Sequence, residues 1–142
     1  MKKLLLLSII VGCLSLVCIP LSAEGANWKL YFINQAKQEF YIETNSIVCL
    51  KDGKVRAWNK NTDSKGEFHL MFLNEVDCAV RMYTLRACEP VNSNNIKDWE
   101  LAEVVMKTWI TPEGKQDWNY IGTSDYDEAM FETWCKESKL KK

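Results

Sequence analysis

The amino-terminal stretch constrains this chain most, because it decides which residues can fold and in which compartment. Two lysines precede an almost unbroken apolar run over residues 4–21, and two small residues follow it. A short positive start, an apolar core and small residues at the end are typical of a secretory signal peptide. The length of the remainder suits one domain. The sequence therefore predicts a removed signal peptide at residues 1–23 and a single domain at residues 24–142.

Two alternatives for this stretch stay open. The apolar run approaches the length needed to span a bilayer, so it could be kept as a membrane anchor. Cys13 follows Gly12, as in the processing site of a bacterial lipoprotein, and its thiol would then carry an acyl anchor. The apolar residues after Cys13 argue against a lipoprotein, whose tether is normally polar. We favour export to the periplasm, the outer membrane or the cell surface.

Four cysteines belong to the predicted mature chain: Cys49, Cys78, Cys88 and Cys135. An even number of cysteines in an exported protein predicts two disulfides, and four cysteines allow three pairings. The spacing argues against a zinc site, since no two cysteines form a Cys-x-x-Cys pair and His69 is the one histidine of the chain. We therefore expect a disulfide-stapled domain without a metal or another cofactor.

Most of the mature sequence has the pattern of an antiparallel sheet. Aromatic and β-branched runs separated by turn residues predict strands over residues 28–33, 39–42, 47–50, 55–58, 67–76, 79–88, 104–110 and 117–121. Asp52-Gly53 predicts a two-residue hairpin turn with positive φ at both residues, which places Leu50 opposite Val55. A second hairpin is expected around residues 111–115.

The carboxyl-terminal part changes to a helical period. Ser124 and Asp127 are placed as a capping box, and apolar residues from Tyr126 onwards recur at helical spacing. This pattern predicts a helix over residues 125–138. The expected fold class is therefore α+β, an antiparallel sheet of about six to eight strands with a C-terminal α-helix packed on it.

Both faces of the central strands carry apolar residues. Leu70 and Phe72 point to one face, whereas Met71 and Leu73 point to the other. An antiparallel sheet with one wet face should alternate cleanly between apolar and polar residues. A single helix covers only one face, so the other needs sheet curvature, a ligand or a second subunit. We hypothesise a homodimer packed sheet to sheet; a monomeric mass in solution would count against it.

No pattern in the sequence indicates an enzyme or a nucleic-acid-binding protein. His69 lies in a strand-like run and is expected to be a sheet-face residue rather than a catalytic base. A Gly-rich phosphate loop and an HExxH motif are both missing from the sequence. Glu75 and Asp77 share a strand face that could bind a cation, but a solvated or Arg81-paired face is the commoner arrangement. The formal net charge of -1 gives no electrostatic reason to expect nucleic acid as a partner.

Trp99 is the candidate for a ligand-binding residue. It lies in a polar connection expected over residues 90–99, between Asp98 and Glu100. An exposed tryptophan concentrates contact energy at protein interfaces. The alternative is that its ring folds back onto its own domain.

Four pieces of the chain, in their order, resemble the surface-adhesin protein E family of small exported bacterial proteins. These pieces are residues 39–47 (EFYIETNSI), Val55-Arg-Ala-Trp58, Glu75-Val-Asp-Cys78 with Arg81, and Trp134-Cys135. The resemblance spans residues 28–136. It implies an antiparallel sheet with a C-terminal helix and a disulfide between Cys78 and Cys135, which leaves Cys49 for Cys88. Cys49 and Cys88 themselves are not part of the shared pattern.

We therefore expect an exported, non-enzymatic binding protein of the bacterial envelope or cell surface. The resemblance implies adhesin-like binding of host or envelope proteins. One alternative is a periplasmic structural or accessory subunit of an envelope assembly. Another is a carrier of a small apolar ligand.

Overall fold

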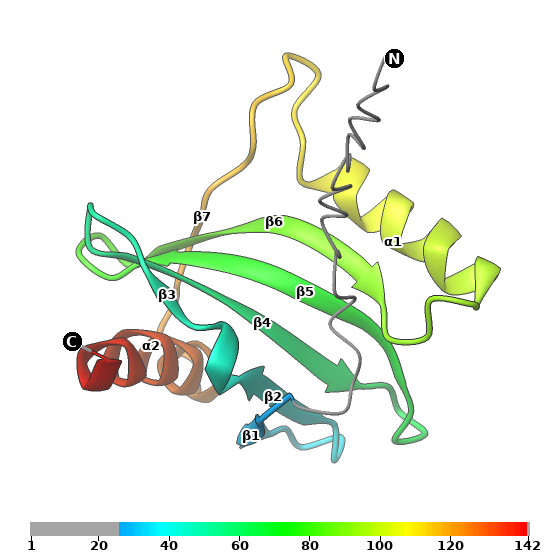
Figure 1. The fold of residues 1–142 in the computed structure, drawn as a ribbon, viewed down its shortest axis with the longest axis horizontal. Coiled ribbons are helices and arrows are strands. Elements are labelled where there is room, and N and C mark those ends of the chain that lie inside the picture. The colour runs from blue at the N-terminus through cyan, green and yellow to red at the C-terminus, as the bar shows by residue number, and fades with distance from the viewer. Residues whose placement is uncertain (1–25, 142) are drawn as a thin grey trace, which may run out of the picture.

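The computed structural model describes residues 26–141. The predicted signal peptide at residues 1–23 and the alternative lipidation residue, Cys13, therefore lie outside the described residues. The described chain forms a seven-stranded antiparallel sheet and two α-helices (Figure 1). The expected α+β class with a C-terminal helix is confirmed. Within residues 26–141, no helix combines the length and the apolar character that crossing a membrane requires.

The elements follow one another in a simple order. The strands are β1 (Trp28–Ile33), β2 (Glu39–Glu43), β3 (Val48–Cys49), β4 (Lys54–Thr62), β5 (Phe68–Asp77), β6 (Met82–Pro90) and β7 (Asn119–Tyr120). The helices are α1 (Ile96–Thr108) and α2 (Asp125–Glu137), with 3₁₀ turns η1 (Thr44–Ser46) and η2 (Ser138–Lys141). The spatial order is β1-β2-β4-β5-β6-β7, and β3 pairs with β4 beside this path. Short turns join β1 to β2, β4 to β5 and β5 to β6, whereas η1 and β3 lie between β2 and β4, and α1 lies between β6 and β7.

Helix α2 lies where the sequence predicts it. Ser124 is the N-cap, and its hydroxyl oxygen accepts a hydrogen bond from the backbone N–H of Asp127 at 3.2 Å. Acidic residues fill the first turn, where the helix dipole favours negative charge. Met130 and Trp134 are buried in one cluster with Val76 of β5. The capping box and the apolar period of the sequence therefore fix this helix locally.

Helix α1 corrects two predictions. Residues 104–110 are predicted as a strand and residues 90–99 as a connection, yet Ile96–Thr108 is a single helix. Asn95 explains where it starts, because its side-chain oxygen accepts hydrogen bonds from two backbone N–H groups of the first turn, including that of Asp98. The β-branched residues of the segment favour a strand only weakly, and packing against the sheet overrides that preference.

Both predicted hairpins differ from the structure in detail. The turn over residues 111–115 forms, but an isolated bridge replaces its expected flanking strands. In the first hairpin Val55 pairs with Cys49, so the predicted pairing with Leu50 is wrong by one residue. Of the two predicted turn residues, Asp52 and Gly53, only Gly53 has a positive φ, 75°. The loop therefore has three residues, a type I turn followed by a left-handed glycine, instead of the predicted two.

The two helices pack on the same face of the sheet. Leu70 and Val76 lie on one face of β5, and they contact α1 and α2 respectively. Tyr83 of β6 links the two clusters, since it packs beside the α2 cluster and its ring centroid lies 5.5 Å from that of Trp109. Figure 1 shows α1 along the β6 side of the sheet and α2 towards β1.

The opposite face of the sheet has no helix on it among the described residues. It carries the β4 side chains that alternate with the buried Val55 and Ala57, including Arg56 and Trp58. We expected one helix to cover one face of the sheet. Instead, both helices of the described residues cover the same face. The homodimer through this second face stays a prediction.

One disulfide joins Cys78, just after β5, to Cys135 of α2, across 57 residues of sequence. This is the pairing that the resemblance implies. The expected second bridge is wrong, because Cys49 and Cys88 are both free. Cys49 is exposed on β3, where its thiol donates to the carbonyl oxygen of Ser138 at 3.3 Å, whereas Cys88 is buried beneath α1. The two thiols belong to different parts of the fold and cannot bridge without rearrangement.

We expect alkylation to separate the two free thiols. Burial, followed by the charge of Glu89, raises the pKa of Cys88 to about 11. Roughly a thousandth of that thiol is then ionised at pH 8, whereas the reactive species in alkylation is the thiolate. Among the four cysteines of the predicted mature chain, iodoacetamide should therefore label only Cys49 in the native protein, and Cys88 only after unfolding. Intact mass and peptide mapping measure this. A native protein that takes up no label would contradict the free Cys49.

Candidate functional site

A groove lies between the two helices on the helix-bearing face of the sheet. Its volume is about 200 Å³. We call it the interhelix groove. It is lined by Asn59, Asn61, Phe72, Asn74, Tyr83, Leu85, Val105, Trp109 and Tyr126. The sheet supplies the floor, α1 supplies Val105 and α2 supplies Tyr126. The groove exists because both helices cover the same face of the sheet.

The side chains that line the interhelix groove are uncharged. Three of its floor residues are asparagines, and three of its lining residues carry an aromatic ring with a polar atom. Asn59 is almost fully buried, and its side-chain N–H donates to the carbonyl oxygen of Phe72 at 2.9 Å. Aromatic rings beside amide groups suit a neutral ligand with one flat apolar face and a polar edge.

The two tyrosines of the interhelix groove remain neutral near pH 7. Burial raises the pKa of Tyr83, and the nearby Asp127 carboxylate adds to this effect. Burial also raises the pKa of Tyr126, and the neighbouring Tyr31 hydroxyl has a smaller opposite effect. Both phenols therefore keep their proton across the physiological range and remain available as hydrogen-bond donors.

A second hollow of about 210 Å³ continues from the groove and shares Asn61 and Phe72 with it. We call it the His69 hollow. Its other lining residues are Gln38, Asp63, His69, Leu70 and Leu101. Unlike the interhelix groove, it contains a carboxylate and an imidazole, those of Asp63 and His69. They come from the β4–β5 turn and from the first residues of β5.

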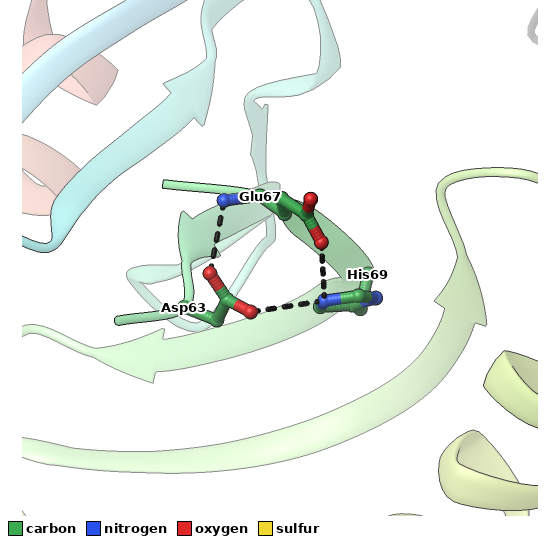
Figure 2. Close-up of side chains that lie close together, drawn as sticks. All are labelled: Asp63, Glu67 and His69. Atoms are coloured by element: carbon green, nitrogen blue, oxygen red, sulfur yellow. Dashed lines mark hydrogen bonds and ion pairs between the residues drawn. The ribbon is translucent and has the colours of Figure 1, made fainter. Parts of the chain in front are cut away.

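His69 lies among three carboxylates, two from the β4–β5 turn and one from α1. Its Nε2 is 3.2 Å from Oδ2 of Asp63 and 3.8 Å from Oε2 of Glu67 (Figure 2). Its Nδ1 is 3.4 Å from Oδ1 of Asp98, which belongs to α1. The hydrogen bond with Asp63 raises the pKa of His69 above its ordinary value, against a smaller effect of desolvation. Backbone hydrogen bonds from Glu67 and Lys65 lower the pKa of Asp63.

The strand alternation alone does not place His69 here. The pairing of β4 with β5 shifts between Lys60 and Thr62, where Thr62 lies opposite Phe68 and Lys60 lies opposite Met71. Such an irregularity lets two successive residues face the same side of a sheet. His69 therefore lies in a strand, as expected, but it faces α1 and the polar turn. The only sequence signal was the polar Asp-Ser-Lys-Gly-Glu stretch before it.

The other predicted site residues are spread over the molecule. Trp99 lies in α1 rather than in a loop; its side chain is 46% exposed, and its ring N–H donates to the carbonyl oxygen of Ser93 at 2.9 Å. Glu75 is only 2% exposed and bonds to Arg56 and Arg86 instead of Arg81. Two guanidinium groups thus already bind the Glu75 carboxylate. It is therefore not free to bind the cation that was considered for this strand face.

Comparison with family models gave no match, and searches of curated proteins and of solved structures gave none either. The resemblance to the surface-adhesin protein E family therefore stays a prediction from the residues.

The Glu75 network predicts a pH-dependent contribution to stability. Burial raises the pKa of Glu75, but the bonds and charges of Arg86 and Arg56 outweigh it and hold the pKa below its ordinary value of 4.5. A lowered folded-state pKa stabilises the fold above the unfolded-state pKa, and this contribution is lost as the pH falls through the folded-state value. Glu75→Gln should therefore destabilise the protein by about 1–3 kcal/mol at pH 7. The difference from wild type should shrink below about pH 4.5.

Thermal unfolding between pH 3 and pH 8 measures this difference. Glu113→Gln is the matched control, since Glu113 lies exposed in the turn of residues 111–115. If both variants had the same melting temperature at pH 7, the arginine network would contribute nothing.

Proposed function

We propose that this chain is an exported, non-enzymatic binding protein of the bacterial envelope or cell surface, with a protein as its partner. The predicted signal peptide supports export. The Cys78–Cys135 disulfide also supports it, because disulfides persist in oxidising compartments. The adhesin-like role that the resemblance implies is part of this proposal.

The exposed apolar side chains of α1 are the observation that carries the proposal. Ile96 is 74% exposed, Val104 60%, Leu101 47% and Trp99 46%. Helix α2 differs, because its described apolar residues are buried or half-buried. An amphipathic helix on a monomer would turn such residues towards the sheet. Several large apolar side chains on one solvent-facing helix are typical of a surface that binds a partner, and tryptophan is a frequent anchor there.

Substitution on α1 tests this proposal. We expect Trp99→Ala and Ile96→Ser to weaken capture of envelope or host-matrix proteins at least tenfold, while the melting temperature changes by no more than about 2 °C. Val80→Ser is the control, since Val80 is 54% exposed in the β5–β6 turn, away from α1. Biolayer interferometry on the captured partner, alongside thermal unfolding, gives both readouts. A large fall in melting temperature for Trp99→Ala would show that the ring serves packing instead.

The interhelix groove favours a second candidate, a carrier of a small neutral ligand. Its wall of aromatic rings and its amide floor could hold such a ligand, and none of its lining residues is charged. If this function holds, native mass spectrometry of the protein purified from its envelope should detect a bound small molecule. Asn74→Leu, which fills the floor, should abolish the added mass, whereas Asn119→Leu on the exposed β7 should not.

The same purification also tests a third function, that of an accessory subunit of an envelope assembly. Purification with one fixed envelope protein at constant stoichiometry would favour an accessory subunit of an assembly. Recovery without any ligand or partner mass would contradict the carrier function.

A further inference from the structure

We propose that Asp63, Glu67 and His69 form a binding site for a divalent transition metal of the Zn²⁺ class, with Asp98 orienting the imidazole. The proposal is independent of the partner-binding function above. It departs from the expectation of a metal-free protein, which rested on the spacing of the cysteines and the single histidine and considered a cation only at Glu75 and Asp77.

The spacing of the ligand atoms suits one metal ion. One imidazole nitrogen and two carboxylate oxygens, all on the same side of the β4–β5 turn, lie within 4.8 Å of one another (Figure 2). Atoms bound to one zinc ion at about 2.0–2.2 Å lie roughly 3–3.5 Å apart. The Asp63–His69 pair already has this separation, at 3.2 Å. Glu67 has a 66% exposed side chain and can close its 3.8 Å gap by a small rotation.

The cluster around His69 has an excess of negative charge, which favours the binding of a cation. Three carboxylates lie within 4 Å of this one imidazole. Even a protonated His69 would leave two negative charges in excess within the cluster. Among the residues that the structure describes, neither a lysine nor an arginine forms an ion pair with Asp63, Glu67 or Asp98. A divalent ion bound to neutral His69 would supply the missing positive charge.

Two of the ligands are held in place before any metal arrives. Oδ1 of Asp63 accepts hydrogen bonds from the backbone N–H of Lys65 at 2.7 Å and of Glu67 at 2.9 Å, which leaves Oδ2 facing His69. On the far side of the ring, Nδ1 lies 3.4 Å from Asp98, whose other oxygen accepts from the side-chain N–H of Asn95 at 2.8 Å. A carboxylate behind a histidine fixes its tautomer and directs the other nitrogen to the metal.

The ligand set points to the class of metal. Calcium and magnesium prefer sites made of oxygen ligands alone. One imidazole with two carboxylates suits Zn²⁺ and its neighbours in the first transition row. Three protein ligands leave coordination positions for water or a further ligand, and the His69 hollow offers space for them beside Asp63. The bound ion would also link the β4–β5 turn, β5 and, through Asp98, helix α1.

Because His69 is the one histidine of the chain, a single imidazole reports on this site. The experiment uses the untagged mature protein with its disulfide intact and adds ZnCl₂ alone. We expect one Zn²⁺ per chain by isothermal titration calorimetry, and a large shift of the His69 Nε2 resonance in ¹⁵N–¹H spectra while Nδ1 keeps its proton. The melting temperature should rise with Zn²⁺ concentration, since the metal binds only the folded site.

Variants assign the binding to these residues. His69→Gln and Asp63→Asn should weaken Zn²⁺ binding at least a hundredfold, and Asp98→Asn about tenfold through the imidazole orientation. Asp52→Asn is the matched control, since it removes an exposed carboxylate from another turn. Cys49→Ser excludes the exposed free thiol as the ligand. Both controls should bind Zn²⁺ like wild type. Melting temperatures in EDTA confirm that each variant is folded.

Two results would overturn the site. One is a His69 spectrum that does not change at millimolar Zn²⁺, which needs no variant and so does not depend on variant folding. The other is Zn²⁺ binding that is equally strong in folded His69→Gln or Asp63→Asn. Neither result would affect partner binding through α1.

Discussion

The packing of α2 against the sheet is the interaction on which the rest of the structure depends. Trp134 and Met130 of α2 are fully buried on β-strand side chains, and Cys135 bonds covalently to Cys78 at the end of β5. A cross-link over such a long stretch of chain stabilises the fold by restricting the unfolded state. The same helix supplies Tyr126 to the interhelix groove. The disulfide therefore holds in place the helix that forms one wall of the interhelix groove.

The placement of both helices on one face of the sheet also decides how the surface is divided. Since α1 and α2 share one face of the sheet, the groove lies between them and the opposite face keeps its half-exposed side chains. Helix α1 contributes to three features at once. Its inner side closes the groove through Val105, its outer side exposes Ile96 and Trp99, and its first turn places Asp98 beside His69. A partner that binds α1 would thus lie close to both hollows.

The sequence predicted some parts of the fold and not others, for physical reasons. The signals for α2 are local, because a capping box and a helical period act within a few residues. The segment of α1 carries β-branched residues that favour strands weakly, so its form depends on the Asn95 cap and on packing against Leu70 and Leu85. In the first hairpin the Asp-Gly pair correctly marked the turn. Its loop length, and with it the register, depended on how β3 meets β4.

The candidate site shows the same division. By itself the sequence determined the fold class, the C-terminal helix and, through the resemblance, the Cys78–Cys135 pairing. It could not bring His69 and Asp98 together, since that contact needs a register irregularity in β5 and a helix packed across it. It also gave Cys49 and Cys88 as partners, whereas the tertiary structure keeps them apart. Local propensity and spacing act along the chain, but sites such as these form between segments that only the packed fold places side by side.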